Sequence, residues 1–239
     1  MAINKEAYTE LMSEVKNKNV TVVAVSKTKA VEDIFELYTL GQKDFGENYG
    51  QELLEKNLKL PPDIRWHFIG HLQTNKVKHI VPFVYLIHSV DSYRLLLEIN
   101  KQGQKIDRVI NCLLQVHIAQ EETKFGFDEK ELGETINELT NIPMKNINVV
   151  GLMGMASFTD NPDKVRGEFK YLKALFDKFK KSGIHLLSNR PGTDVNEAVG
   201  QGNPKSEILS MGMSNDYKIA IEEGSNMIRI GSLLFGERV

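Results

Sequence analysis

A lysine closes the first apolar run of the chain, where it could act as a nucleophile. Residues 20–25 are Val-Thr-Val-Val-Ala-Val, and Lys27 follows after one serine. A lysine held at the mouth of a barrel is partly desolvated, which lowers its pKa and leaves a neutral amine that can attack a carbonyl carbon. The alternative is that Lys27 and Lys29 are solvated charges, which is the commoner situation for lysines at strand ends.

Two Gly/Ser segments near the C-terminus could hold a phosphate group. They are Ser210-Met211-Gly212-Met213-Ser214 and Arg229-Ile230-Gly231-Ser232. The turns after the last two strands of a barrel commonly bind phosphate, because backbone N–H groups and a helix N-terminus converge there. The alternative is that Gly212 and Ser214 form only a turn and an N-cap for the next helix. Together with Lys27 and Arg229, the segments favour a ligand that carries both a carbonyl group and a phosphate.

Arg229 precedes Gly231 by two residues, so strand alternation places the two on the same face. An arginine that points into a barrel needs a partner. One alternative is a structural ion pair with Glu47 or Asp91. The other is the ring nitrogen of a cofactor, which an arginine contacts in some pyridoxal phosphate sites.

The histidines and the single cysteine give weaker signals. His67, His71, His79 and His88 form neither a His-Glu-x-x-His nor a Cys-x-x-Cys arrangement. We therefore expect them to pack or to form hydrogen bonds, and we expect no metal site. Cys112 lies within an apolar run, which argues against a catalytic thiol. No residue is assigned a catalytic role.

The elements that would position these residues alternate between strands and helices. The expected strands are 20–25, 43–46, 65–70, 82–90, 107–118, 146–153, 207–211 and 226–234. The clearest amphipathic helices are 5–18, 31–40, 91–103, 128–143, 163–182 and 214–223, where Asp91 and Asp128 are candidate caps.

Roughly eight βα units without a change in composition predict one domain over residues 1–239. The fold class is α/β, a single (β/α)₈ TIM barrel with an extra N-terminal helix. An open doubly wound sheet is the alternative, because periodicity predicts strands but not closure; no Gly-x-Gly-x-x-Gly motif supports its dinucleotide-binding form. The turn-rich segment Gly183–Lys205 predicts a long, mobile loop.

Composition and charge exclude several classes of function. The 239 residues are 41% hydrophobic and 26% charged, which is typical of a globular protein with a full core. The formal net charge is −2, so no global positive field is available to hold nucleic acid. No apolar run approaches the roughly 18 to 20 residues that cross a bilayer. The single cysteine and the charged first 20 residues predict a cytoplasmic protein.

Five separated motifs together resemble those of a known family. They are Ala24-Val25-Ser26-Lys27-Thr28-Lys29, Phe45-Gly46-Glu47-Asn48-Tyr49, Trp66-His67-Phe68-Ile69-Gly70-His71-Leu72-Gln73-Thr74-Asn75-Lys76, Leu209-Ser210-Met211-Gly212-Met213-Ser214 and Arg229-Ile230-Gly231-Ser232. In this order and spacing they resemble the pyridoxal phosphate homeostasis proteins, and the resemblance covers essentially the whole chain.

The resemblance implies a barrel like the N-terminal domain of alanine racemase, with pyridoxal 5′-phosphate (PLP) bound as a Schiff base on Lys27. It implies a ring-nitrogen contact from Arg229. The implied cofactor-binding set is Lys27, Asn48, Ser210, Met211, Gly212, Ser214, Arg229, Gly231 and Ser232. The implied role is intracellular homeostasis of vitamin B6 and amino acids, with PLP-dependent apoenzymes as recipients and a monomer or weak dimer as the assembly. Two departures are His117, where the family more often has Asn, and the longer segment Gly183–Lys205.

The main alternative function is a PLP-dependent amino-acid racemase. A racemase needs bases on both faces of the substrate carbanion, and alanine racemases carry the second base on a further domain, for which this chain leaves no residues after Val239. An arginine at the ring nitrogen also weakens the cofactor as an electron sink. A remoter alternative is an aldolase that uses Lys27 without a cofactor. We therefore expect a protein that holds or delivers PLP, with little turnover.

Overall fold

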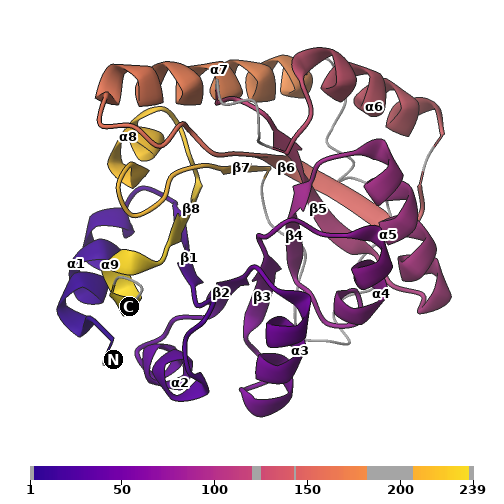
Figure 1. Cartoon of the computed structure of the whole chain (residues 1–239). Coiled ribbons are helices and arrows are strands. Elements are labelled where there is room, and N and C mark those ends of the chain that lie inside the picture. The colour runs from indigo at the N-terminus through magenta and orange to yellow at the C-terminus, as the bar shows by residue number, and fades with distance from the viewer. Residues whose placement is uncertain (1–2, 120–124, 143, 182–206, 237–239) are drawn as a thin grey trace.

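Eight parallel strands form a closed barrel surrounded by helices in the computed structural model, which describes residues 3–119, 125–142, 144–181 and 207–236 (Figure 1). The strands are β1 (Thr21–Val25), β2 (Asp44–Glu47), β3 (Arg65–Phe68), β4 (Leu86–Val90), β5 (Ile110–Val116), β6 (Ile147–Gly154), β7 (Ile208–Ser210) and β8 (Met227–Ile230). They follow one another around the barrel in sequence order, and β1 pairs with both β2 and β8. The predicted (β/α)₈ barrel is confirmed, and the open sheet is excluded.

The helices are α1 (Lys5–Val15), α2 (Val31–Thr39), α3 (Gly50–Lys59), the 3₁₀ helix η1 (Thr74–Lys76), α4 (Val77–Ile80), α5 (Tyr93–Lys105), α6 (Glu129–Asn141), α7 (Pro162–Lys181), α8 (Tyr217–Glu222) and α9 (Ser232–Phe235). The capping box of α6 is confirmed, since Asp128 and Glu131 bond to each other's backbone N–H groups. The cap of α5 is Ser92 and not Asp91, whose carboxylate instead bonds to His71. In the part of the chain that the structure describes, no helix is long and apolar enough to cross a membrane.

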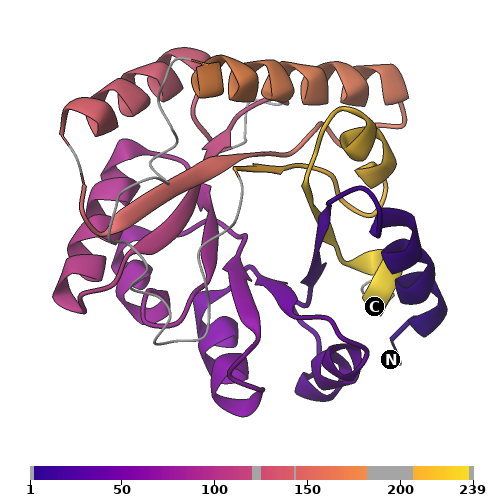
Figure 2. The ribbon, with the colours of Figure 1, turned by 180° about the vertical axis from the view of Figure 1, so that it is seen from behind.

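The helix α1 takes the place of the eighth outer helix, as Figure 1 shows on the side of β1 and β8. Lys5 of α1 forms an ion pair with Glu36 of α2, and Glu14 accepts a hydrogen bond from the Tyr217 hydroxyl of α8. The Asn4 N–H donates to the Leu234 carbonyl in α9 (2.8 Å). The two ends of the described chain therefore lie side by side, as both Figure 1 and Figure 2 show.

Two apolar layers hold the strands. A small cluster fills the barrel, and its members are Val23, Leu86, Leu113, Val150, Met153, Ile208 and Met227. A larger cluster lies between the strands and the helices and includes Phe45, Trp66 and Phe169. Strand alternation explains this division, because successive side chains point to opposite faces of the sheet. Inward positions nearer the strand ends are left for polar side chains.

The last strand is shorter than the sequence predicted. It stops at Ile230, and the apolar residues that follow, such as Leu234, belong to α9. The strand predicted over 82–90 likewise begins only at Leu86, after a turn. The predicted loop Gly183–Lys205 lies outside the described residues.

Candidate functional site

The predicted site residues come together at the rim formed by the carboxyl ends of four strands. Lys27 follows β1, Asn48 follows β2, residues 211–214 follow β7, and Gly231 follows β8. These strands are neighbours in the closed barrel, in the order β7, β8, β1, β2. A Cβ atom on Gly231 would lie 3.4 Å from the Cβ of Val25, so β1 and β8 end side by side.

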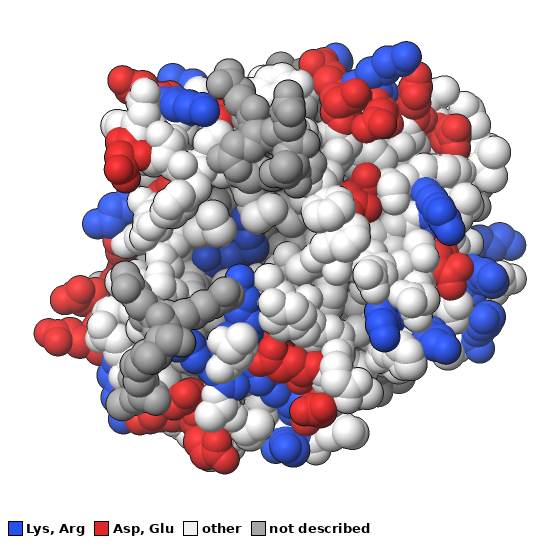
Figure 3. All heavy atoms as spheres, in the orientation of Figure 1, with Lys and Arg blue, Asp and Glu red and all other residues white. Residues whose placement is uncertain are grey.

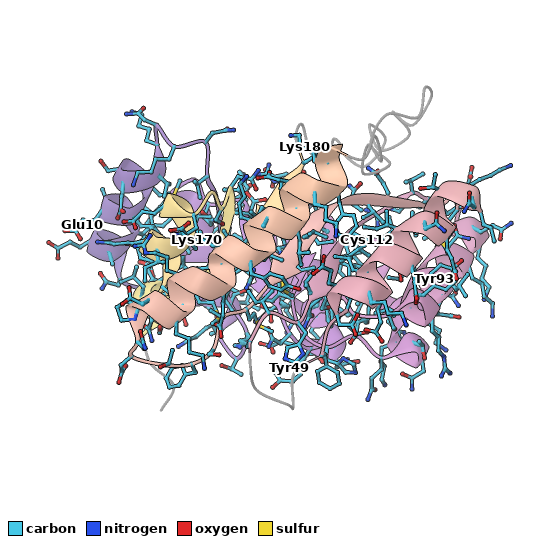
Figure 4. All side chains as sticks on the ribbon, turned by 90° about the horizontal axis from the view of Figure 1, so that it is seen from above. Glu10, Tyr49, Tyr93, Cys112, Lys170 and Lys180 are labelled. Atoms are coloured by element: carbon cyan, nitrogen blue, oxygen red, sulfur yellow. The ribbon has the colours of Figure 1, made fainter. Side chains whose placement is uncertain are left out.

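The rim faces the viewer in Figure 3, where Lys and Arg side chains lie at the floor of a hollow near the middle of the molecule. Tyr49, next to the end of β2, lies at one edge in Figure 4, and Lys180, near the end of α7, lies at the opposite edge. A cavity of about 460 Å³ adjoins Asn48 and is lined by Tyr49, His71 and Lys76, among others.

The two lysines after β1 have different surroundings. Lys27 is half-buried, and the turn around it is fixed by a bond from the Lys29 N–H to the Ser26 carbonyl (3.0 Å). Thr28 has a φ of +63°, in the left-handed region, and its N–H donates to Glu52 Oε1 (2.6 Å). The Lys29 ammonium donates to the Phe235 carbonyl at the end of α9 (2.7 Å). The Lys29 side chain thus joins the turn after β1 to the end of α9. Lys27, by contrast, is the lysine that we assign to the rim.

A buried charge cluster supports the turn that carries Lys27, and the sequence analysis missed it. The Lys56 ammonium donates to the Ser26 carbonyl (2.7 Å), to Glu47 Oε1 (2.7 Å) and to Glu52 Oε1 (2.6 Å). Ser26 also donates its hydroxyl hydrogen to Glu47 Oε1 (2.6 Å). Burial raises the pKa of Glu47, although the charge of Lys56 opposes this. The only sequence signal was Glu47, a glutamate next to the end of a predicted strand.

The turn after β7 is shaped by Gly212 and closed by Ser214. Gly212 has a φ of +98°, and its carbonyl accepts from the Arg229 N–H (2.9 Å). The Ser214 hydroxyl accepts from the N–H groups of Gly231 (3.2 Å) and Leu233 (3.5 Å). The sequence offered Ser214 as a possible cap of the next helix, but in the structure it does not cap α8. Its oxygen instead occupies a position at the start of α9 to which backbone N–H groups point.

Arg229 is buried inside the barrel and is held by three acceptors. Its Nη1 donates to the Ser210 carbonyl (3.0 Å) and to the Ser210 hydroxyl (2.7 Å), and its Nη2 donates to the Gly154 carbonyl (3.0 Å). Burial lowers the pKa of Arg229 to about 10, and the charge of Asp216 opposes this, so the guanidinium is cationic at neutral pH.

Neither ion pair suggested for Arg229 is present among its described contacts. Glu47 pairs with Lys56, and the carboxylate of Asp91 bonds to His71. The inward orientation predicted from strand alternation is confirmed, because Arg229 reaches β6 and β7 across the interior.

Other polar residues fill structural roles. His67 and His88 are buried and hydrogen-bonded to each other, as expected. Cys112 is buried, which raises the pKa of its thiol and leaves it unreactive. In the described ranges no group of three or more His, Cys, Asp or Glu side chains could hold a metal. His117 is half-buried after β5, and its N–H donates to the Phe127 carbonyl (2.9 Å).

The sequence of the chain is similar to a known family model and to named proteins of other organisms. Residues 4–193 match the family model of the alanine racemase N-terminal domain. A pyridoxal phosphate homeostasis protein of Aquifex aeolicus is 40% identical over 218 residues, which are 91% of this chain and 86% of that protein. A human protein of the same name is 37% identical over 227 residues, covering 91% of this chain and 76% of that protein.

The chain is also similar to solved structures that share its barrel fold. PipY of Synechococcus elongatus, solved with PLP bound, is 29% identical with a TM-score of 0.77, covering 97% of this chain and 99% of that one. Its structure without PLP gives 30% identity and a TM-score of 0.80, with the same coverage. Alanine racemase of Bartonella henselae shares the fold at 15% identity and a TM-score of 0.66, over 95% of this chain and 56% of that one.

Proposed function

The chain belongs to the family of pyridoxal phosphate homeostasis proteins, and we propose that it binds pyridoxal 5′-phosphate and maintains the intracellular balance of vitamin B6 and amino acids. The observation that carries this proposal is the convergence at one rim of a lysine, a buried arginine and a turn rich in backbone donors. Lys27, Arg229 and Ser214 come from three neighbouring strands and match three polar parts of that cofactor: its aldehyde, its ring nitrogen and its phosphate.

The residues present at the rim fit this group. Asn48 Oδ1 is buried and has no hydrogen-bond partner among the described residues, so it is an acceptor available at the rim. The N–H groups of Gly231 and Leu233 point to one place, which the Ser214 hydroxyl occupies. Backbone donors at such a turn are a common arrangement for phosphate in barrels.

We assign the binding roles as follows. Lys27 supplies the amine for covalent attachment, Arg229 lies toward the ring nitrogen, and the remaining residues of the set surround the cofactor. The full set is Lys27, Asn48, Ser210, Met211, Gly212, Ser214, Arg229, Gly231 and Ser232. Within it Ser210 acts through Arg229, because its buried hydroxyl accepts the bond from Nη1.

Arg229 also favours a protein that holds PLP and not one that converts amino acids. When bound, PLP supplies an aldehyde for condensation with amines and a ring that accepts electrons from an attached substrate. An arginine only donates hydrogen bonds, so it does not stabilise a protonated ring nitrogen as a carboxylate would. A ring held in this way is a weaker electron sink. The racemase alternative rests on a shared fold alone.

The finer properties are part of the same proposal. We take residues 1–239 as one PLP-binding barrel domain of a cytoplasmic protein that is a monomer or weak dimer. PLP-dependent apoenzymes are its proposed recipients. A protein that holds a reactive aldehyde and releases it to apoenzymes limits the aldehyde's reaction with other amines.

Covalent trapping tests the assignment of Lys27. Borohydride reduction of the PLP-loaded protein, followed by peptide mapping, should place the pyridoxyl group on Lys27. Lys27→Ala should lose this label. The matched variant Lys29→Ala should keep it, because Lys29 is engaged with α9. A label on Lys29, Lys56 or Lys76 in the wild-type protein would make the assignment wrong.

The same preparation separates the holding role from the racemase alternative. Exchange of α-deuterium in amino acids at about 1 to 10³ per second, a usual enzymatic rate, and its loss in Lys27→Ala would favour the racemase.

A further inference from the structure

A continuous chain of buried hydrogen bonds crosses the barrel and ends on Arg229. Asp44 Oδ1 lies 3.0 Å from His67 Nε2, and His67 Nδ1 lies 2.9 Å from His88 Nε2. His88 Nδ1 lies 3.1 Å from the Ser210 hydroxyl, which accepts from Arg229 Nη1 at 2.7 Å. The five side chains come from β2, β3, β4, β7 and β8, and all are buried.

The two ends of this hydrogen-bond chain, Arg229 and Asp44, have fixed hydrogen-bond roles. Arg229 only donates, so the Ser210 oxygen must accept from it. At the other end, burial raises the pKa of Asp44, but hydrogen bonds from Arg65 and His67 outweigh this and bring it to about 2. Asp44 is thus a carboxylate at neutral pH and only accepts. His67 Nε2 must therefore carry the hydrogen that is donated to it.

With both imidazoles neutral, every bond between these ends has one direction. A neutral His67 that carries its hydrogen on Nε2 has a bare Nδ1, which accepts from His88 Nε2–H. His88 Nδ1 is then bare and accepts the hydroxyl hydrogen of Ser210. Each group in the chain is satisfied, and no hydrogen is left without an acceptor.

The reverse direction needs an additional positive charge. If His88 Nδ1–H donated to Ser210, His67 would have to donate from both nitrogens and become an imidazolium. That charge would be added in the interior, where both imidazoles are fully buried. The Ser210 hydrogen would also lose its bond to His88. The first direction satisfies every group without an added buried charge, and it is therefore the one that the geometry favours.

We propose that His67 and His88 are positioning residues for Arg229, acting through the Ser210 hydroxyl. By drawing the hydroxyl hydrogen toward β4, His88 keeps the Ser210 oxygen turned to the guanidinium. Arg229 is then held in one orientation at the site where PLP is proposed to bind. This inference rests on the proposed function and assigns a part in it to two buried side chains outside the predicted binding set.

The test replaces His88 and compares PLP affinity with stability. His88→Leu removes the acceptor for Ser210, whereas His88→Gln keeps one acceptor and one donor. Leu86→Ala on the same strand is the control, because it removes buried interior volume and leaves the chain intact. PLP dissociation constants come from absorbance titration, and unfolding midpoints from thermal melts. The ¹⁵N NMR spectrum of the PLP-free protein reports which imidazole nitrogens carry hydrogens.

We expect His88→Leu to weaken PLP binding about tenfold, and His88→Gln to stay within about threefold of wild type, as loss of one hydrogen bond implies. Leu86→Ala should lower the melting temperature with little effect on affinity. The NMR spectrum should show His88 with a hydrogen on Nε2 and a bare Nδ1. Failure of the wild-type protein to bind PLP would overturn the proposed function, whereas the NMR spectrum of the PLP-free protein would still test the direction of the hydrogen bonds. Wild-type affinity in a folded His88→Leu, or a hydrogen on His88 Nδ1, would overturn the positioning role.

Discussion

The Ser214 hydroxyl shows how one side chain can connect two elements at the rim. From the sequence it is a candidate phosphate contact or a helix cap, because it follows a Gly-containing turn and precedes a helical pattern. In the structure it accepts from Gly231 and Leu233, so it joins the turn after β7 to the start of α9. The cap position of α8 is occupied by Asp216. A serine near two helix starts is ambiguous until the strands are placed in space.

Replacing Ser214 with alanine should weaken PLP binding. The change removes one hydroxyl contact and the two bonds that hold the start of α9 against the β7 turn, which together cost on the order of 1 to 3 kcal/mol. The dissociation constant should rise about 5- to 150-fold at tenfold per 1.4 kcal/mol, as measured by absorbance titration. Asn148→Ala is the control, because that buried side chain bonds to Asn111 near the starts of β6 and β5, at the opposite ends of the strands from the rim. Its loss should lower stability alone. An unchanged affinity in both Ser214→Ala and Ser232→Ala would exclude phosphate recognition by this turn.

Residue types revealed some of the site and hid other parts. Lys27 and Arg229 were identifiable because a charge that follows or interrupts an apolar strand must find a partner. Lys56 was not identifiable, because its bonds to Glu47 and Ser26 join a helix to two strands, and lysines on helices are usually exposed. The link between His67 and His88 was hidden for a similar reason, since only the pairing and register of β3 and β4 bring these two side chains together.

At the scale of elements, the sequence predicted each strand but not every end. A run such as 226–234 is rich in apolar residues on both sides of Gly231, and only the turn at that glycine divides it into β8 and α9. The 3₁₀ helix η1 and the one-turn helix α4 were not predicted, because four residues carry no periodic signal. These boundaries matter, because the turns that they define carry the predicted site residues.

The turn after β7 depends on glycine at position 212, and Gly212→Ala tests it. A Cβ atom there would lie 2.6 Å from the Cβ of Ala220 and 3.0 Å from the Cα of Tyr217, and the φ of +98° adds strain. We expect a loss of about 1 to 3 kcal/mol in unfolding free energy, from strain and overpacking, together with weaker PLP binding.

A matched glycine at the other end of α8 separates these two effects. Gly224 has a φ of +96°, and the nearest atoms to a Cβ there belong to the flexible Lys173 side chain. Gly224→Ala should therefore lose stability from the strained backbone and keep its PLP affinity. Equal losses of affinity in Gly212→Ala and Gly224→Ala, measured by titration on the folded proteins, would argue against a specific role of the β7 turn.

At the scale of the whole molecule, closure of the barrel brings the two ends of the chain together. The pairing of β1 with β8 unites Lys27, near the start of the sequence, with Arg229, near its end. Periodicity could not show this, because an open sheet and a closed barrel have the same pattern of strands and helices. The place of α1 beside α8 and α9 follows from the same closure.

PLP should stabilise the whole fold, because the proposed contacts join the strands at the β1–β8 seam. A ligand that binds only the folded state at 100 times its dissociation constant contributes about 2.7 kcal/mol. At roughly 2 to 4 °C per kcal/mol for a chain of this size, the melting temperature should rise by about 5 to 11 °C over the PLP-free protein. Differential scanning calorimetry measures this shift, and hydrogen exchange should slow most in β1, β7 and β8. Lys27→Ala at the same PLP concentration is the control and should show a smaller shift, since the covalent contact is absent. A protein that is fully loaded by its absorbance spectrum yet melts at the PLP-free temperature would place the cofactor away from the seam, on a surface that the fold does not need.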